Sequence, residues 1–144
     1  MFLKHLWYVK KENMNNFPTH GFLLAGQWVK SATVKSGVTY KLTALASQRV
    51  VYSFVVDGVP KYIGICEKDT TPLKDRIQRY KAQVGGSTNE RISNNIKQLL
   101  DQGKIVEIYA LKPSQKVNFV DLQVDLVKGL ENPLIARFKP EWNR

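Results

Sequence analysis

Two tyrosines ten positions apart are the first side chains in this sequence whose placement suggests chemistry. Tyr52 and Tyr62 stand on either side of Asp57-Gly58 in the stretch RVVYSFVVDGVPKYIG, residues 49–64. Tyrosine is a common strand residue, so both rings could simply pack in a core. Both phenols could instead point into one site, where a tyrosine serves as a general base only if its pKa falls below the usual value of about 10.

An arginine and a glutamate further along the chain could complete a site for phosphodiester hydrolysis. That reaction needs an activated water and positive charge to offset the negative charge that develops on the phosphate. The planar guanidinium of Arg76 could hold a phosphate, and the carboxylate of Glu131 could bind a hard divalent cation, Mg²⁺ or Mn²⁺. Each also has a plainer interpretation, because Arg76 could be a solvated helix residue and Glu131 could complement a helix dipole.

The charge balance points to a polyanionic partner. The chain has 144 residues, with 22 Lys and Arg against 12 Asp and Glu, which gives a formal net charge of +10. A balance this basic favours a nucleic acid, although a solvated basic surface would give the same composition. The basic residues are spread along the chain, so they do not form a disordered basic tail.

Length, hydropathy and cysteine content limit the classes of protein to which the chain can belong. The length fits one domain with one core, and no apolar run approaches the length that spans a membrane. The single cysteine, Cys66, excludes an internal disulfide framework and suits a reducing cytoplasm. One cysteine and two histidines also argue against a zinc site. We therefore expect a cytoplasmic protein with no membrane partner.

The stretch that carries the two tyrosines predicts a β-hairpin. Two runs of β-branched and aromatic residues flank Asp57-Gly58, which is a strong turn signal. Side chains alternate between the faces of a strand, so Tyr52 and Tyr62 share a face only if the loop is odd in length or a bulge shifts the count. We predict a loop of three or five residues, spanning 57–59 or 56–60.

The remaining elements predict a small α/β (α+β) fold. Thr71 suits the N-cap of a first helix and Pro72 its first turn, and Gly85-Gly86 would end that helix. In the last helix Pro133 would either mark the first turn, with a start near Lys128, or bend a helix that begins earlier. The predicted elements are strands 50–56 and 61–66, helices 73–84 and 88–102, strand 104–111 and helix 124–138. This β-β-α-α-β-α order predicts a small three-stranded antiparallel sheet flanked by helices.

Residues 1–47 are interpreted as an N-terminal β-containing extension, packed on a core domain of residues 48–144. Weak alternation around Ser36-Gly37 predicts a short β-hairpin in the extension. Four apolar residues near the start could form one face of a helix: Phe2, Leu3, Leu6 and Trp7.

Short motifs in the core domain resemble the GIY-YIG nuclease family over residues 48–144. Tyr62-Ile63-Gly64 matches the family's second motif letter for letter, whereas the first motif keeps only Tyr52 and has Val50 and Val51 in place of Gly and Ile. The family's later elements match, in chain order, Arg76 in the helix after the second motif, Glu131 in Glu-Asn-Pro-Leu-Ile, and Asn143 in the closing Pro-Glu-Trp-Asn.

The resemblance implies a metal-dependent endonuclease that hydrolyses DNA phosphodiester bonds, similar to small stand-alone restriction-type or phage-type enzymes. It implies that Tyr52 is the base toward the attacking water, that Tyr62 positions the water or the phosphate, and that Glu131 binds Mg²⁺ or Mn²⁺. Tyr80 stands where the family often has His or Tyr one turn after its catalytic Arg, and it could pack, act in catalysis, or both. The candidate catalytic residues are Tyr52, Tyr62, Arg76, Tyr80, Glu131 and Asn143.

Basic residues on the two middle helices are candidate nucleic-acid contacts, because they could follow phosphates on either side of the cut. They are Lys74, Arg79, Lys81, Arg91 and Lys97. The expected partner is double-stranded DNA, bound by a monomer or a homodimer. Two alternatives stay open: a catalytically inactive nucleic-acid-binding module, which the altered first motif would favour, and an RNA-directed nuclease, which the charge permits equally.

Overall fold

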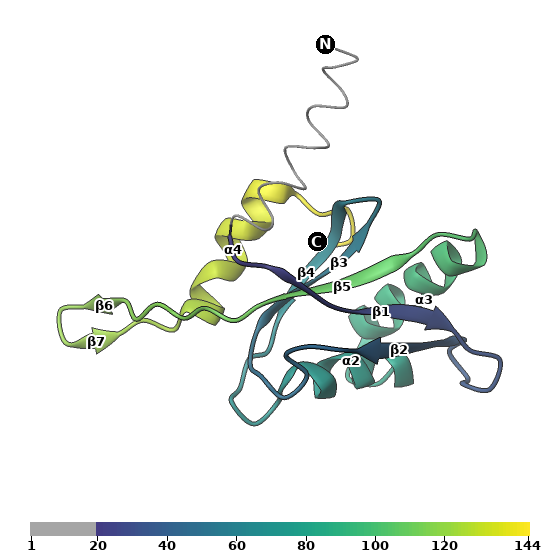
Figure 1. The fold of residues 1–144 in the computed structure, drawn as a ribbon, viewed down its shortest axis with the longest axis horizontal. Helices are drawn as coiled ribbons and strands as arrows, with labels where there is room; N and C mark the ends of the chain where they lie inside the picture. Colours follow the sequence, from purple (N-terminus) through teal and green to yellow (C-terminus); the bar gives the residue numbers. More distant parts are fainter. Residues whose placement is uncertain (1–19) are drawn as a thin grey trace, which may run out of the picture.

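The computed structural model describes residues 20–144, so the helical face predicted at residues 2–7 lies outside the described part of the chain. The described chain forms a five-stranded antiparallel sheet in the order β2-β1-β5-β3-β4, with helices on both faces (Figure 1). The elements are β1 (Leu23–Lys30), β2 (Val38–Leu42), β3 (Val51–Val56), β4 (Val59–Ile65), α2 (Leu73–Ala82), α3 (Ser87–Asp101), β5 (Val106–Leu111), β6 (Asn118–Phe119), β7 (Leu122–Gln123) and α4 (Leu126–Phe138). None of the helices within residues 20–144 is long and apolar enough to cross a membrane.

The mixed class predicted from the sequence is confirmed, and the predicted order is found in β3, β4, α2, α3, β5 and α4. The main sheet has five strands, so the prediction of three is wrong. The two further strands come from the extension: β1 pairs with β5, and β2 pairs with β1 as the hairpin predicted around Ser36-Gly37. A three-stranded sheet would leave the edge of β5 open, and β1 satisfies those backbone groups.

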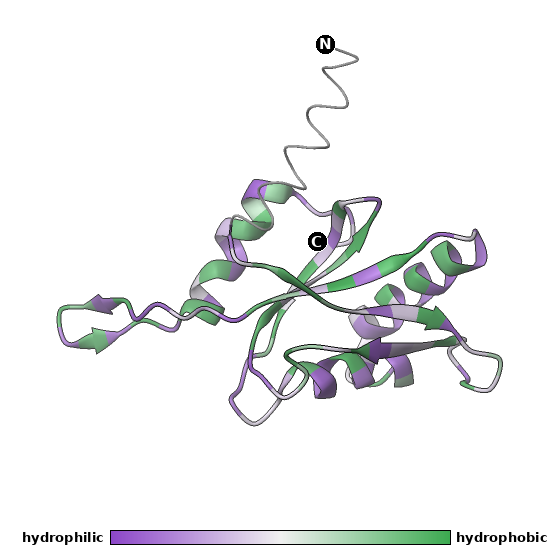
Figure 2. Cartoon of the chain, viewed as in Figure 1, coloured by the Kyte–Doolittle hydropathy of each residue, from purple (hydrophilic) through white to green (hydrophobic). Residues whose placement is uncertain are grey.

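The interior strand β3, which lies between β5 and β4, is buried along its whole length. Tyr52, Phe54 and Val56 point to the face that α2 and α3 cover. Val51 and Val55 point to the opposite face, where α4 packs. The central strands are correspondingly green, the colour of hydrophobic residues, in Figure 2. Burial on both faces explains why this segment is a continuous apolar run in the sequence and not an alternating one.

The β3–β4 hairpin turns through two residues, so the predicted loop of three or five residues is wrong. Asp57 and Gly58 have φ values of 52° and 75°, and Val56 pairs with Val59 across them. Two consecutive residues with positive φ form the kind of turn whose twist matches that of the flanking strands. The Asp-Gly signal therefore predicts the position of the turn correctly. The predicted loop length is wrong because it was derived from the requirement that the two tyrosines share a face.

A bulge close to the turn satisfies that requirement. Pro60 pairs with Val55, as the two-residue turn requires. The next pair is Tyr62 with Phe54, so Lys61 is one extra residue in β4. Proline has no N–H to donate to a ladder, which makes the strand beside it a suitable place for a bulge. Because Phe54 lies two positions from Tyr52, both tyrosines face the same side of the sheet.

The limits of α2 lie close to the prediction. The helix begins at Leu73 with Pro72 as its N-cap, so the N-cap predicted at Thr71 is wrong by one residue. It ends where Gln83 adopts the left-handed conformation, with φ 56°, just before the predicted stop at Gly85-Gly86. A residue in this conformation commonly terminates a helix, and the two glycines then lead the chain into α3.

The last helix, α4, contains Pro133, and a start near Lys128 is wrong. Asp125 caps the helix, and its carboxylate accepts a hydrogen bond of 3.2 Å from the backbone N–H of Lys128. Pro133 lacks the N–H that would otherwise bond to the carbonyl of Gly129. The correct interpretation is therefore the longer helix with an internal proline.

Between β5 and α4, β6 and β7 form a two-stranded ribbon that projects from the body of the molecule (Figure 1). No strand is predicted there from the sequence. Phe119 pairs with Leu122, and the N–H of Val124 donates to the carbonyl of Val117 at 2.7 Å. These four side chains share one face of the ribbon and are exposed. The chain thus enters α4 from outside the body of the protein.

Candidate active site

Three tyrosines, which we call the tyrosine cluster, meet on the face of the sheet that α2 and α3 cover. Tyr52 comes from β3, Tyr62 from β4 and Tyr80 from α2. The hydroxyl oxygens of Tyr52 and Tyr80 lie 2.7 Å apart, and the ring centroids of Tyr62 and Tyr80 lie 6.2 Å apart. The ring of Phe54 lies between the two strand tyrosines, 5.6 Å from Tyr52 and 5.9 Å from Tyr62. The bulged hairpin thus brings both strand tyrosines into one cluster.

Arg76 is held by this cluster. Its Nε and Nη2 each lie 3.3 Å from the hydroxyl oxygen of Tyr52, and Nη2 also lies 3.3 Å from that of Tyr80. Arg76 and Tyr80 are four residues apart on α2, so they lie on one side of the helix. The Nη1 group makes no hydrogen bond to another residue in the described chain, so the guanidinium is oriented on one side and keeps donors for an anion on the other.

Gly64 leaves the space that the ring of Tyr52 fills. The two residues are directly opposite in the hairpin, and a Cβ added to Gly64 would lie 2.6 Å from the hydroxyl oxygen of Tyr52. Real Cβ atoms essentially never come this close to another atom, so a larger residue would displace the tyrosine. The glycine of the Tyr-Ile-Gly motif therefore has a steric role in this chain.

All three phenols of the cluster keep their protons at neutral pH. Burial raises the pKa of Tyr52 far above its ordinary value, although the positive charge of Arg76 partly opposes this. Burial and then the neighbouring Tyr80 raise the pKa of Tyr62, and burial and then Tyr52 raise the pKa of Tyr80. In the free protein the hydroxyls are therefore neutral, and those of Tyr52 and Tyr80 orient Arg76 through hydrogen bonds.

Glu131 lies on α4 at a half-buried position. Its helical neighbours Val127 and Leu134 are buried, so Glu131 lies on the side of α4 that faces the sheet. Burial and then the negative charge of Glu67 raise the pKa of Glu131, and the charge of Glu131 helps to raise the pKa of Tyr62. The carboxylate therefore lies within electrostatic reach of both Glu67 and Tyr62.

The pair of carboxylates suits one hard divalent cation. Among residues 20–144, no three or more His, Cys, Asp or Glu side chains gather closely enough to hold a metal ion by themselves. Mg²⁺ commonly takes one or two carboxylates and completes its shell with water and substrate phosphate, and a cation beside Glu131 and Glu67 would relieve their repulsion. Sequence reasoning missed Glu67, because an exposed glutamate shortly after Gly64 carries no distinguishing pattern.

A hollow of about 240 Å³ opens beside Arg76. Glu67, Lys68, Thr71 and Arg79 line the rest of it. Within the described residues, Lys68 and Arg79 form neither an ion pair nor a hydrogen bond through their side chains, so their charges are not neutralised by a neighbour. Three cationic side chains around one hollow suit a phosphate group.

No family model and no curated protein matches the chain. Among solved structures, a glutamate-to-alanine mutant of bacteriophage T4 EndoII superposes with a TM-score of 0.68, covering 90% of this chain and 97% of that one, at 19% sequence identity. The chain shares the fold of bacteriophage T4 EndoII. Restriction endonuclease HPY188I in complex with product DNA is also similar, at 20% identity over 86% of this chain and 76% of that one, but its TM-score of 0.49 is too low to carry an argument.

Asn143 lies on the open edge of β4, where its side-chain amide makes two hydrogen bonds to the backbone. Its Oδ1 accepts from the backbone N–H of Ile63 and its Nδ2 donates to the carbonyl of the same residue, both at 2.9 Å. The neighbouring Trp142 is buried and its backbone N–H donates to the carbonyl of Lys61. The structure therefore places Asn143 as a clamp that holds the C-terminal tail on β4, and not within the tyrosine cluster.

The five predicted DNA contacts differ in their surroundings. Of these residues, Arg79 lines the hollow beside Arg76. Arg91 donates to the carbonyl of Trp142 at 3.0 Å, and Lys97 forms an ion pair of 2.7 Å with Asp101. Lys74 is exposed on α2, and the ammonium of Lys81 lies 5.6 Å from the ring centroid of Tyr40. Of the five, Arg79 is thus the residue that lines the hollow of the candidate site.

Proposed function

We propose that the chain is a metal-dependent endonuclease of the GIY-YIG type that hydrolyses DNA phosphodiester bonds. The observation that carries the proposal is the guanidinium of Arg76, which Tyr52 and Tyr80 hold beside a hollow that also exposes Glu67. The motif resemblance and the fold shared with bacteriophage T4 EndoII support the same conclusion. A cation-lined hollow that also exposes the carboxylate of Glu67 is an arrangement that suits phosphate chemistry.

Arg76 is the proposed ligand of the scissile phosphate, through the N–H groups that it does not donate to the tyrosines. Lys68 and Arg79, on the same hollow, would hold the phosphate next to it. The net charge of +10 would draw double-stranded DNA to the protein and make affinity fall with added salt. Further contacts along α2 and α3 would come from Lys74, Lys81, Arg91 and Lys97.

Tyr52 is the proposed general base, and its surroundings define what the step requires. The Tyr52 side chain is fully buried, so the base step requires that water reach its hydroxyl once DNA is bound. The positive charge of Arg76 favours the phenolate of Tyr52, whereas burial opposes it. Tyr62, which is half-buried at the edge of the cluster, would position the water or the phosphate. Tyr80 would keep Tyr52 and Arg76 oriented.

Glu131 is the proposed metal ligand, with Glu67 as a second carboxylate. When bound there, Mg²⁺ or Mn²⁺ would offset the negative charge that develops on the phosphate during attack. The contribution of the chain itself would be to place Glu67 on the hollow that Arg76 lines and Glu131 on the side of α4 that faces the sheet.

A small enzyme of this kind fits a restriction-type or phage-type role. A monomer has one site and would nick one strand of a duplex, whereas a homodimer would bring two sites to the DNA.

Cleavage assays on three substrates test the proposal. Supercoiled plasmid, labelled single-stranded DNA and RNA are incubated with the protein, each with and without Mg²⁺ or Mn²⁺. We expect nicking of the plasmid only when a metal is present. DNA binding without cleavage in any metal would overturn the proposal in favour of an inactive binding module, and a clear preference for RNA would make the chain an RNA-directed nuclease.

A further inference from the structure

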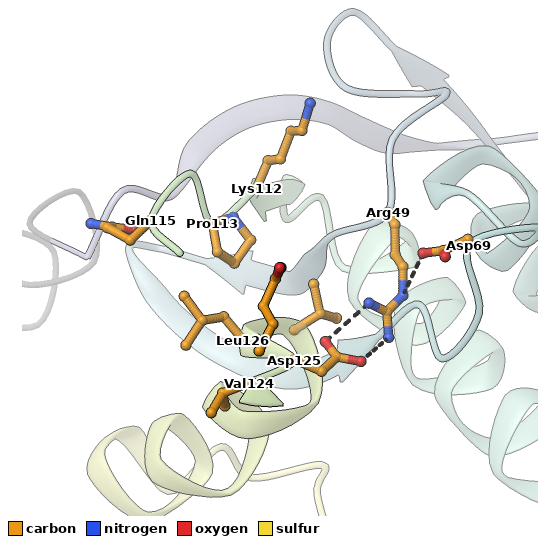
Figure 3. A pocket seen from close by; sticks show the side chains of 10 residues that line it. Arg49, Asp69, Lys112, Pro113, Gln115, Val124, Asp125 and Leu126 are labelled. Atoms are coloured by element: carbon orange, nitrogen blue, oxygen red, sulfur yellow. Dashed lines mark hydrogen bonds and ion pairs between the residues drawn. The ribbon is translucent and has the colours of Figure 1, made fainter. Parts of the chain in front are cut away.

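A single guanidinium, that of Arg49, joins three segments of the chain, and Figure 3 shows its contacts with Asp125 and with Asp69, which lies 3.8 Å from Nε. Its Nη1 and Nη2 donate to the two carboxylate oxygens of Asp125 at 3.0 and 2.9 Å, in a bidentate pair. Its Nε and Nη2 also donate to the carbonyls of Cys66 and Glu67, each at 2.9 Å. Only 18% of the Arg49 side chain is exposed. These contacts tie the start of β3 to the end of β4 and to the start of α4.

Asp125 is the residue through which Arg49 reaches α4. It is the N-cap of the helix, and Arg49 keeps its carboxylate charged by lowering its pKa. The chain arrives at Asp125 from the ribbon that projects away from the body of the protein (Figure 1). The first turn of α4 is therefore fixed on the body of the protein by Asp125 and by the buried Val127. Arg49 therefore helps to decide where α4 begins.

Arg49 contacts the backbone of one candidate metal ligand, Glu67, and the N-cap of the helix that carries the other, Glu131. Arg49 fixes the backbone of Glu67 directly, and it fixes the helix that carries Glu131 through Asp125. Glu67 lies two residues past the end of β4, and α4, which carries Glu131, packs against β4. A bidentate arginine–carboxylate pair constrains direction as well as distance, which a lysine pair would not do.

We propose that Arg49 and Asp125 are a positioning pair, which sets the separation of Glu67 and Glu131 and thereby the affinity of the site for its divalent cation. The inference rests on the proposed function. Groups that orient metal ligands from outside the coordination shell commonly change metal affinity or activity by about 10- to 100-fold, and a pair that acts through the backbone should change it somewhat less.

A double-mutant cycle tests this role. The variants are Arg49→Gln, Asp125→Asn and their combination; asparagine is chosen because it still caps a helix while removing the charge. Mn²⁺ binding to the DNA-free protein is measured by electron paramagnetic resonance, and the Mg²⁺ concentration for half-maximal plasmid nicking is measured alongside. We expect each single variant to raise the Mn²⁺ dissociation constant and the half-maximal Mg²⁺ concentration about five- to tenfold. The nicking rate at saturating metal should stay within about twofold of the wild type. The double variant should bind the metal about as weakly as Arg49→Gln, because Arg49→Gln already breaks the pair with Asp125 along with the bonds of Arg49 to Cys66 and Glu67.

A matched control comes from the other end of β3. Asp57→Asn makes the same chemical change and removes the 2.9 Å ion pair between Asp57 and Lys104, while asparagine suits the positive φ of the turn. It should leave both metal measurements at the wild-type values. Unfolding free energies of all variants are measured in urea, so that a general loss of stability is separated from a change at the metal site.

Two results would overturn the positioning role. One is a set of variants whose unfolding free energies fall while both metal measurements stay within about twofold of the wild type. The other is a double variant in which the two single effects add, since the residues would then act independently. A wild-type protein that neither nicks DNA nor binds Mn²⁺ would overturn the proposed function, and the positioning role with it. An active wild type with unaffected variants would overturn the positioning role alone.

Discussion

The hydroxyl oxygens of Tyr52 and Tyr80 lie 2.7 Å apart, and Arg76 donates hydrogen bonds to both. Tyr52 is in a strand and Tyr80 is in a helix, so this contact joins the hairpin motif to the helix that carries the arginine. Buried hydroxyls are costly without partners, and here each one is satisfied by the others. The arrangement gives Arg76 one fixed orientation, which is a property that a phosphate-binding arginine needs.

Replacing Tyr80 by phenylalanine tests this orientation. Tyr80→Phe keeps the ring in the core but removes one acceptor from Arg76 and the partner of Tyr52. We expect the single-turnover rate of DNA nicking to fall about 10- to 100-fold, with little change in DNA affinity. Tyr40→Phe is the matched control, because Tyr40 donates to Gln78 at 2.9 Å outside the cluster. Equal rates for the two variants would contradict the role assigned to Tyr80.

Gly64→Ala tests the close approach of Tyr52 to the opposite strand. The new Cβ would fall 2.6 Å from the hydroxyl oxygen of Tyr52, so the ring must shift and its contacts with Arg76 change. We expect a loss of stability of about 1–3 kcal/mol, measured in urea, and a larger loss of nicking than the stability change explains. Gly129→Ala is the control, because its Cβ would meet only ordinary contact inside α4 and should stabilise by about 0.5–1 kcal/mol. Full activity in Gly64→Ala would show that the ring position does not matter.

The hairpin shows both what the sequence predicts and where it stops. Asp57-Gly58 predicts the turn because few residues tolerate positive φ. The bulge at Lys61 could not be predicted, since it depends on how Pro60 and the neighbouring strand share hydrogen bonds. Tyr52 and Tyr62 share one face of the sheet because of the bulge and not because of the loop length.

The candidate site divides in the same way. Arg76 and Tyr80 are recognisable from motif spacing, and helical periodicity puts them on one side of α2. Glu67 was missed because its approach to Glu131 depends on how α4 docks beside the end of β4, which local sequence does not encode. The pairing of β1 with β5 was not predicted for a similar reason, since the sequence of a strand does not indicate which distant strand it pairs with.

Asn143→Ala tests the clamp on the edge of β4. The substitution removes two hydrogen bonds to the backbone of Ile63, so we expect the free energy of unfolding to fall by about 1–3 kcal/mol. Asn118→Ala, on the exposed ribbon, should change it by less than about 0.5 kcal/mol. We expect the nicking rate of folded Asn143→Ala to stay within about threefold of the wild type. A loss of nicking without a loss of stability would instead place Asn143 in the catalytic machinery.

Alkaline pH should unfold the protein through the tyrosine cluster. The pKa values of Tyr52, Tyr62 and Tyr80 are raised in the folded state, so these phenols bind protons more tightly than unfolded tyrosines do. Their contribution to stability is complete below about pH 10 and is lost as pH rises beyond it, at up to about 1.4 kcal/mol per pH unit for each phenol. Urea unfolding at pH 8 to 11 measures the slope. In Tyr52→Phe the slope should be smaller by about one proton, and an unchanged slope would contradict the raised pKa of Tyr52.

The most direct measurement compares wild-type protein with Glu131→Gln on supercoiled plasmid in Mg²⁺, under single-turnover conditions. The substitution keeps the shape of the side chain and removes the charge that would bind the cation. We expect the wild type to nick the plasmid and Glu131→Gln to be slower by at least about 1,000-fold, while DNA affinity stays within about twofold. A Glu131→Gln variant that nicks DNA at the wild-type rate would contradict metal-dependent hydrolysis at this site.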